Sequence, residues 1–490
     1  MRSLRLQRHL TAIALVVLCG ASHSRASDTT AQSTLAAAPF PNQLPLPEYL
    51  RQLTDWNGLR STLERAGLKF TFSYYGGGFA NPIGGMKQGL GYDGRFATIV
   101  DADLEKLMGW SGAGFHASIQ QIQGTQFSAK DLDNMMLVSG VEAPPSMQLF
   151  NLWIEQKFGG QINLRFGQFT AAQEFLVSDN ANLFVNSTFG WPVFTAQDLP
   201  SGGPAFPEAT PGARLEFTPN KQLTVRAAVF DGDPAGPGGG SPVDRDPYGV
   251  AFRVNDPPLF IAELDYDYGQ DQIGSVQENP NQEGENAHPA VRQSSPAGAA
   301  GTVTIGAWLH TGSFADERFS AAGGLLAASG GAPQQHWGDY AVYGVLDQAL
   351  WRLPGGSDRG LNFFLRATAA PSDRNMIDRY ADGGFTFKGP TASRPDDTTG
   401  ISLAFGRVSS QAAAYDRDII AMTGAAMPVR DFEAVVELTY QWKLANNWFI
   451  QPDLQYIVHP GGNIPNPLGP SSTAPIPNAF VFGTQMIMRF

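Results

Sequence analysis

The 490-residue sequence carries a formal charge of −12, with 11% aromatic and only 16% charged residues. The acidic balance excludes the basic surface of a nucleic-acid-binding protein. Beyond the N-terminal segment, no apolar run reaches the about 18–20 residues that a transmembrane helix needs. The fraction of charged residues is low compared with about 25% in soluble domains. If the chain is exported, two classes of protein remain: a soluble β protein or a closed β-barrel in a membrane.

The first 26 residues have the order of a secretory signal peptide. Arg2, Arg5 and Arg8 precede the apolar run 10–19, and Ser24-Arg-Ala26 forms a small-x-small cleavage site. We expect cleavage after Ala26, which removes four arginines and leaves a mature charge of −16.

No residue pattern predicts a metal, a cofactor or a catalytic group. Cys19 is the only cysteine, and a lipoprotein anchor, the alternative role for it, needs a small residue where Leu18 stands. His116 and His310 are isolated from other metal-ligating residue types. Asp231-Gly-Asp233 lacks the further spaced acids of a calcium loop and indicates a turn.

The N-terminal part of the mature chain divides into two segments. Residues 27–47 are rich in Ala, Ser, Thr and Pro and predict a flexible leader. Residues 48–66 carry a loose leucine stripe that predicts a short helical segment, ended by Gly67. Because it precedes the first strand, we expect this segment at the periplasmic mouth of a barrel spanning 67–490.

From Leu68 onward, the hydrophobic period changes to two, which is typical of strands. The alternation alone does not separate a soluble sandwich from a barrel whose apolar face meets lipid. Three features favour the barrel: segments of about ten residues, the length that crosses a bilayer; aromatic residues near segment ends; and no helices expected after residue 68 to cover a sheet. The fold class is therefore all-β, a transmembrane antiparallel barrel.

The alternation gives seventeen candidate strands, of which we expect sixteen to be real because bacterial barrels use even numbers. Gly- and Pro-rich gaps at 178–211, 231–248, 270–300 and 321–338 predict loops, mostly external, one of which is a candidate to fold inward and narrow the pore. The candidate strands are 68–76, 91–104, 113–123, 147–158, 161–169, 212–219, 222–230, 249–255, 259–269, 302–311, 339–352, 360–370, 378–388, 399–408, 431–443, 448–458 and 479–490.

The last strand ends at an aromatic residue. Phe480, Phe482, Met486, Met488 and Phe490 alternate with polar or small residues. A terminal strand of this kind that ends in Phe resembles the signal by which outer-membrane barrels engage their assembly machinery, although an ordinary edge strand would show the same alternation.

Several segments in this order resemble the carbohydrate-selective porin family over about 45–490. They include Trp56-Asn-Gly-Leu-Arg60, Arg165-Phe-Gly-Gln168, the stretch 184–192 and, most specific, 451–462. The resemblance implies a 16-stranded barrel in the outer membrane of a Gram-negative bacterium that admits monosaccharides and related polyols by diffusion. The low-complexity stretch 233–240 departs from the family pattern, so the resemblance does not predict the geometry of that extracellular loop.

Strand parity predicts which residues face the water-filled interior. A lipid-facing Arg would cost about 2–4 kcal/mol, so Arg95 and Arg165 are the first candidates for the constriction. The alternative is that such charges only brace the wall. The predicted pore-lining and substrate-contacting residues are Arg95, Arg165, Arg214, Arg226, Arg253, Asp101, Glu155, Glu216, Glu263, Asp265, Glu433, Glu437, Trp153 and Trp308.

The predicted function is passive diffusion of small carbohydrates through an outer-membrane porin, with sugars, membrane lipid and the assembly machinery as partners. The first alternative is a general porin without sugar preference. An outer-membrane hydrolase would need a Ser–His motif that the sequence lacks, and a soluble ligand-binding sandwich would not stay with the membrane. The sequence does not distinguish a monomer from a homotrimer.

Overall fold

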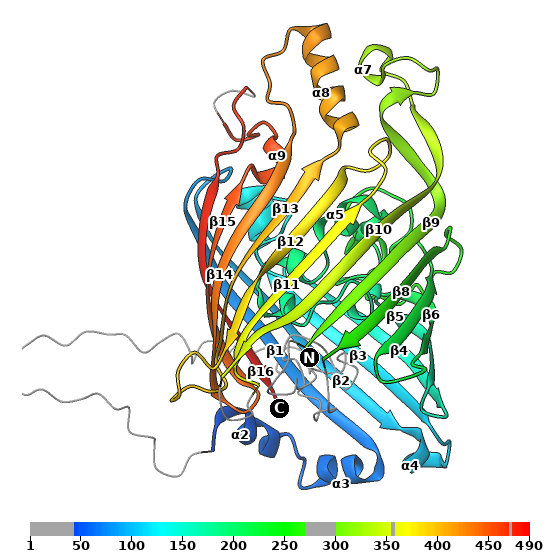
Figure 1. Ribbon diagram of the computed structural model, residues 1–490, viewed down its shortest axis with the longest axis vertical. Helices are drawn as coiled ribbons and strands as arrows, with labels where there is room; N and C mark the ends of the chain where they lie inside the picture. The colour runs from blue at the N-terminus through cyan, green and yellow to red at the C-terminus, as the bar shows by residue number, and fades with distance from the viewer. Residues whose placement is uncertain (1–43, 270–299, 354–357, 470–472) are drawn as a thin grey trace, which may run out of the picture. The chain divides into compact units, whose positions relative to one another are not determined.

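The structure is a computed structural model that describes residues 44–269, 300–353, 358–469 and 473–490. Within these residues, sixteen antiparallel strands close into one barrel (Figure 1). Each strand pairs with its neighbours in the chain, and β1 pairs with β16. Closure leaves no unpaired sheet edge, which is the condition for a β structure to sit in hydrocarbon. The predicted fold class and strand number are confirmed.

The strands are β1 (Leu68–Ile83), β2 (Gly89–Asp103), β3 (Ala113–Gly124), β4 (Ser146–Phe158), β5 (Ile162–Phe169), β6 (Thr210–Phe217), β7 (Leu223–Phe230), β8 (Leu259–Tyr268), β9 (Gly301–Ser320), β10 (Pro333–Arg352), β11 (Gly360–Ala369), β12 (Ile377–Lys388), β13 (Thr398–Val408), β14 (Phe432–Ala445), β15 (Trp448–Val458) and β16 (Ala479–Arg489).

The candidate strand at 249–255 is wrong, and the other sixteen are confirmed. Tyr248, Gly249 and Phe252 have positive φ values of 81°, 64° and 46°, which an extended strand does not allow. The Asp246 carboxylate also accepts the backbone N–H groups of Val250 and the residue after it, at 3.2 and 3.1 Å, and so curls the segment into a turn.

The hairpin of β9 and β10 is longer than predicted. Both strands contain 20 residues, so the loop expected at 321–338 shrinks to a tip between Ser320 and Pro333. The predicted signal peptide 1–26, the leader up to residue 43 and nearly all of the loop expected at 270–300 lie outside the described residues.

The helices are short. In chain order they are α2 (Leu46–Leu53), α3 (Leu59–Ala66), α4 (Leu104–Met108), α5 (Val193–Asp198), α6 (Pro242–Arg245), α7 (Leu326–Ser329), α8 (Ser410–Thr423) and α9 (Pro460–Asn463). The longest of them, α8, has 14 residues and lies in the loop between β13 and β14, beyond the ends of the strands (Figure 1). None of the helices in the described part of the chain has both the length and the apolar character needed to cross a membrane.

The predicted helical segment 48–66 is two helices, α2 and α3. They are separated by Trp56, Asn57 and Gly58, whose φ values are 49°, 60° and 86°, and α3 ends at Gly67, as expected. The Arg60 guanidinium donates to the Phe70 carbonyl at 2.6 Å, which ties α3 to the start of β1.

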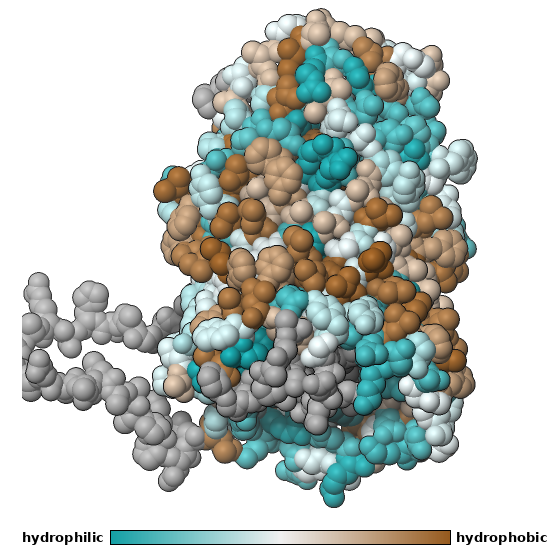
Figure 2. Space-filling view, in the orientation of Figure 1, coloured by the Kyte–Doolittle hydropathy of each residue, from teal (hydrophilic) through white to brown (hydrophobic). Residues whose placement is uncertain are grey.

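Along the strands, apolar residues that face outward alternate with polar residues that face the interior, which is the inverse of a soluble protein. In β8, Leu264 and Tyr266 are exposed, whereas Glu263 and Asp265, which alternate with them, are buried. Figure 2 shows the result as a hydrophobic band around the middle of the visible face, bordered by hydrophilic surface at both ends. Exposed apolar rows and enclosed charges are the pattern of a membrane barrel and the opposite of a soluble sandwich.

The first strand and the C-terminal residue meet where the barrel closes. Phe72 and Phe490 exchange backbone hydrogen bonds of 2.9 Å, and their rings stack with centroids 5.6 Å apart. The terminal residue thus extends the pairing of β1 with β16. Its role as an assembly signal stays a prediction.

The band generates a stability prediction at Leu264. We expect Leu264→Arg to lower the free energy of unfolding from lipid vesicles by about 2–4 kcal/mol, because the new charge would face hydrocarbon. The matched control is Val254→Arg, at an exposed loop residue, which should change it by less than about 0.5 kcal/mol. Urea titration measures both, and equal effects would contradict a lipid-facing band.

Candidate functional site

Two long loops fold back against the inner wall of the barrel: residues 125–145, between β3 and β4, and residues 170–209, between β5 and β6. Backbone groups removed from water need hydrogen-bond partners, and inward side chains of the wall supply them. The inward fold that the sequence predicted for one loop therefore applies to two.

The 125–145 loop is held by β14 and β15. The Glu433 carboxylate accepts the backbone N–H groups of Met135 and Met136 at 2.9 and 2.7 Å. The Gln455 amide donates to the Val138 carbonyl at 2.9 Å. Glu433 is fully buried, so these donors take the place of the water that a carboxylate would otherwise require.

The 170–209 loop is held in the same way. The Glu437 carboxylate accepts the N–H groups of Val185 at 2.6 Å and Asn186 at 3.0 Å. Across the barrel, the Glu263 carboxylate accepts the N–H group of Leu176 at 2.5 Å. Three predicted pore-lining carboxylates, those of Glu433, Glu437 and Glu263, are thus anchors for backbone.

Arg366 is a loop anchor that the sequence analysis missed. Its side chain is 1% exposed and pairs with Asp382 at 2.5 Å. It also donates to the loop carbonyls of Leu176, Thr188, Phe189 and Gly190. The inward parity of Arg366 in β11 was a usable signal, because Leu365 beside it faces outward.

Arg165 and Arg214 form a buried cluster with two glutamates. Arg165 donates to Glu155 at 2.6 Å and pairs with Glu174 of the 170–209 loop. Arg214 donates to the same carboxylates at 3.4 and 3.1 Å. The Arg165 guanidinium also lies 3.9 Å from the ring centroid of Trp153. This cluster, the Arg165 clamp, joins the base of the 170–209 loop to the barrel wall.

The remaining predicted residues lie on the wall, with one exception. Arg226 pairs with Glu216 at 2.8 Å and Asp265 at 2.5 Å. Asp101 pairs with His116, whose ring stacks on Trp153, and Trp308 is buried. Arg253 is the exception: it lies in the loop after β7, where it pairs with Asp256 at 2.7 Å, because its expected strand does not form.

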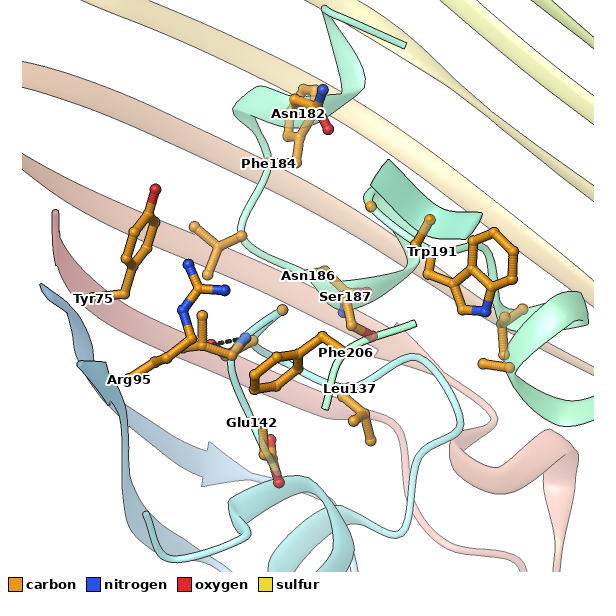
Figure 3. A pocket seen from close by; sticks show the side chains of 18 of the residues that line it. Tyr75, Arg95, Leu137, Glu142, Asn182, Phe184, Asn186, Ser187, Trp191 and Phe206 are labelled. Carbon is orange, nitrogen blue, oxygen red and sulfur yellow. Dashed lines mark hydrogen bonds between the residues drawn. The ribbon is translucent and has the colours of Figure 1, made fainter. Parts of the chain in front are cut away.

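A cavity of about 380 Å³ separates the two loops from the wall at β1, β2 and β16. Arg95 of β2 and Tyr75 of β1 lie side by side in it, with Phe206 of the 170–209 loop next to them (Figure 3). The Arg95 guanidinium is 4.6 Å from the Tyr75 ring centroid and 5.7 Å from that of Phe206. Of the two first candidates, Arg95 lines this cavity, whereas Arg165 lies in the clamp.

The cavity offers mixed chemistry to a solute. Gln485 of β16 adds an amide to the wall, and Ser187 and Trp191 line the opposite side from the loop. The Tyr75 hydroxyl and the Thr170 hydroxyl are buried and make no hydrogen bond within the described residues. Polar groups enclosed without partners are available to a ligand or to water.

Sequence reasoning missed the loop side of the cavity. Tyr75 had a signal, since it has the opposite parity to Phe72 and Tyr74, which share the apolar face of this strand. Phe206 and Trp191 had none, because their places depend on how the 170–209 loop folds. Among the described residues, no group of three or more His, Cys, Asp or Glu side chains could hold a metal ion.

Glu142 fixes the turn of the 125–145 loop. Its carboxylate accepts from the backbone N–H and the hydroxyl of Ser128, at 2.7 and 2.6 Å, and points away from Arg95 (Figure 3). Burial raises the pKa of the Glu142 carboxyl to about 7. The folded state therefore binds this proton more tightly than the unfolded chain does.

Comparison with known proteins gives one family and two kinds of relative. Residues 87–490 match the model of the carbohydrate-selective porin, OprB family. Porin B of Pseudomonas aeruginosa is 25% identical over 431 residues, which cover 84% of this chain and 87% of that protein.

Two solved structures of Pseudomonas putida OprB have the same fold. The high-pH structure matches with a TM-score of 0.73 and 22% identity, and the match covers 89% of this chain and 97% of that one. The low-pH structure covers the same shares with a TM-score of 0.50 and 18% identity.

The anchors predict a change in loop stability. In Glu437→Ala, two buried N–H groups lose their acceptor, which costs about 1–3 kcal/mol for a buried donor left unsatisfied. We expect added protease to cleave the folded protein within residues 170–209 at least about tenfold faster. Glu216→Ala, an inward carboxylate paired with Arg226, is the control, and cleavage sites are mapped by mass spectrometry. Unchanged cleavage in Glu437→Ala would contradict the anchoring role.

The raised pKa of Glu142 predicts a pH dependence. Its protonated form contributes stability below pH 4.5, the ordinary value, and this contribution is lost as the pH rises toward about 7. Between pH 5 and 8, Glu142→Gln should therefore become more stable relative to the unsubstituted protein, by at most about 3 kcal/mol. Thermal unfolding at both pH values tests this, with the exposed Glu105→Gln as control. A difference independent of pH would contradict it.

Proposed function

The chain belongs to the carbohydrate-selective porin, OprB family, and from this premise we propose that small sugars cross the outer membrane passively through the cavity beside Arg95. The barrel is a sugar-selective porin of the Gram-negative outer membrane. Family and fold point to a channel rather than an enzyme. No energy coupling and no covalent step form part of the proposed passage.

The cavity suits a neutral monosaccharide for physical reasons. Sugar hydroxyls accept hydrogen bonds from the Arg95 guanidinium and exchange them with the Tyr75 hydroxyl, and the C–H face of the ring packs on the rings of Tyr75 and Phe206. A volume of about 380 Å³ lies at the low end of the range for small-molecule sites. Binding must remain weak, since a tight site would stop flux.

The observation that carries the proposal is the position of Arg95 between two aromatic rings in a cavity bounded by both infolded loops. We assign the other predicted residues to a different role. The carboxylates of Glu433, Glu437 and Glu263 and the Arg165 clamp hold the loops that bound the cavity. They shape the passage and need not touch the sugar.

The remaining partners are proposals from the same premise. The apolar band meets membrane lipid, and the terminal Phe490, paired with Phe72, presents the assembly signal of the last strand.

The proposal predicts a specific effect of Arg95→Ala. Loss of a charged donor worth about 1.5–3 kcal/mol should raise the dissociation constant for block of single-channel current by glucose about tenfold or more. Arg253→Ala, which removes an arginine from a loop ion pair, is the matched control and should leave glucose block unchanged. Equal block in Arg95→Ala and the unsubstituted protein would remove Arg95 from the pathway.

Liposome swelling separates selective passage from the general-porin alternative. Glucose, arabinose, sucrose and amino acids are compared in the same vesicles. Faster entry of the monosaccharides than of amino acids of similar size supports the proposal. Equal rates at equal size would favour a pore without sugar preference.

A further inference from the structure

Two arginines stand side by side on the outer face of the barrel, where no role in the channel accounts for them. Arg379 of β12 and Arg407 of β13 are register partners. Their neighbours in the chain, Asp378, Tyr380 and Val408, are buried, so both arginines point away from the interior. Arg379 is exposed, and the Arg407 side chain is 41% exposed.

The pair lies at one border of the apolar band. Phe405, two residues before Arg407 on the same face, is exposed, and its ring lies 5.1 Å from that of Phe432. Phe432 in turn lies 4.6 Å from the His459 ring. Aromatic residues of this kind mark the level where hydrocarbon gives way to headgroups, and the arginines come immediately beyond them.

The same end of the barrel carries the long loops. Val408 is followed by residues 409–431, which contain α8, whereas β14 and β15 are joined at the opposite end by only two residues, 446 and 447. Long loops face outside and short turns face the periplasm in such barrels. The arginine pair therefore lies at the depth of the outer-leaflet headgroups.

Two like charges opposite each other on neighbouring strands repel, because their Cβ atoms are about 4.5–5.5 Å apart. Asp378 offsets part of this repulsion, since it accepts from Arg407 at 2.8 and 2.6 Å. The nearby Asp431 carboxylate lies 2.9 Å from Nδ1 of His459. Among the described residues, the Arg379 side chain has no ion-pair partner. The Arg379 guanidinium is therefore left facing the headgroups without a carboxylate of its own.

We propose that Arg379 and Arg407 bind the phosphate group of an outer-leaflet lipid. Guanidinium groups match phosphate with paired N–H donors, and a bound phosphate removes the repulsion between them. The acyl chains of the same lipid continue along Phe405 and Phe432, so one molecule satisfies both the charge and the apolar surface below it. This lipid site is independent of the solute pathway inside the barrel.

The test uses the full-length protein in detergent with diphosphoryl lipid A as probe, and native mass spectrometry to count bound lipid. Arg379→Ala combined with Arg407→Ala should weaken binding at least tenfold. Arg394→Ala is the matched control: this arginine lies 5.0 Å from the ring of the exposed Trp442 near the opposite end of the barrel. Replacement of both residues by Lys keeps the charge, loses the paired donors and should weaken binding less than Ala does.

Two further arms identify what is bound. Lipid A with its phosphates removed should bind the unsubstituted protein at least tenfold more weakly, a comparison that does not depend on whether any variant folds. Inorganic phosphate at equal concentration should not displace the lipid, because it lacks the acyl chains. Equal binding of the dephosphorylated lipid, displacement by inorganic phosphate, or unchanged binding in the double Ala variant would overturn the proposal.

Discussion

Buried carboxylates on the inner wall need hydrogen-bond donors, and backbone N–H groups of the infolded loops supply them. An ionised carboxylate enclosed without partners is too costly to persist, and so is loop backbone removed from water. Glu433, Glu437 and Glu263 meet both requirements at once, since each accepts at least one backbone N–H group from a loop that has turned inward. The channel is narrowed because the wall and the loops satisfy each other.

This constraint divides the inward charges into two kinds. Most are fully engaged: the Arg165 clamp, the Arg226 cluster and the Arg366 anchor brace the wall or hold backbone. Arg95 differs, because it lies between aromatic rings in the cavity that the loops enclose. This division explains how a wall rich in charged residues can admit a neutral solute. Most of the charged side chains support the wall and the loops, and few of them line the cavity.

Alternation predicted the barrel well because each strand is a local pattern, readable within about ten residues. It failed at 249–255, where the positive φ of Phe252 and the Asp246 turn are invisible to a period of two. The fold of the inward loops could not be predicted from a local pattern, because it depends on contacts such as that of Glu437 with Val185, which are 252 residues apart in sequence. Parity correctly turned Arg95 inward, but which inward charge lines the cavity depends on those distant contacts. No local pattern therefore predicted that Phe206 lies in the cavity.

The account claims above all that the cavity beside Arg95 lies on the path of the solute. Cys19 is the only cysteine of the sequence, so Ser187→Cys combined with Cys19→Ser places a single thiol at the loop wall of the cavity. Single-channel recording with a charged, water-soluble thiol reagent then reports on the path. The account predicts that modification reduces the current and that glucose slows the modification. A modified thiol with unchanged current, or a rate indifferent to glucose, would contradict it.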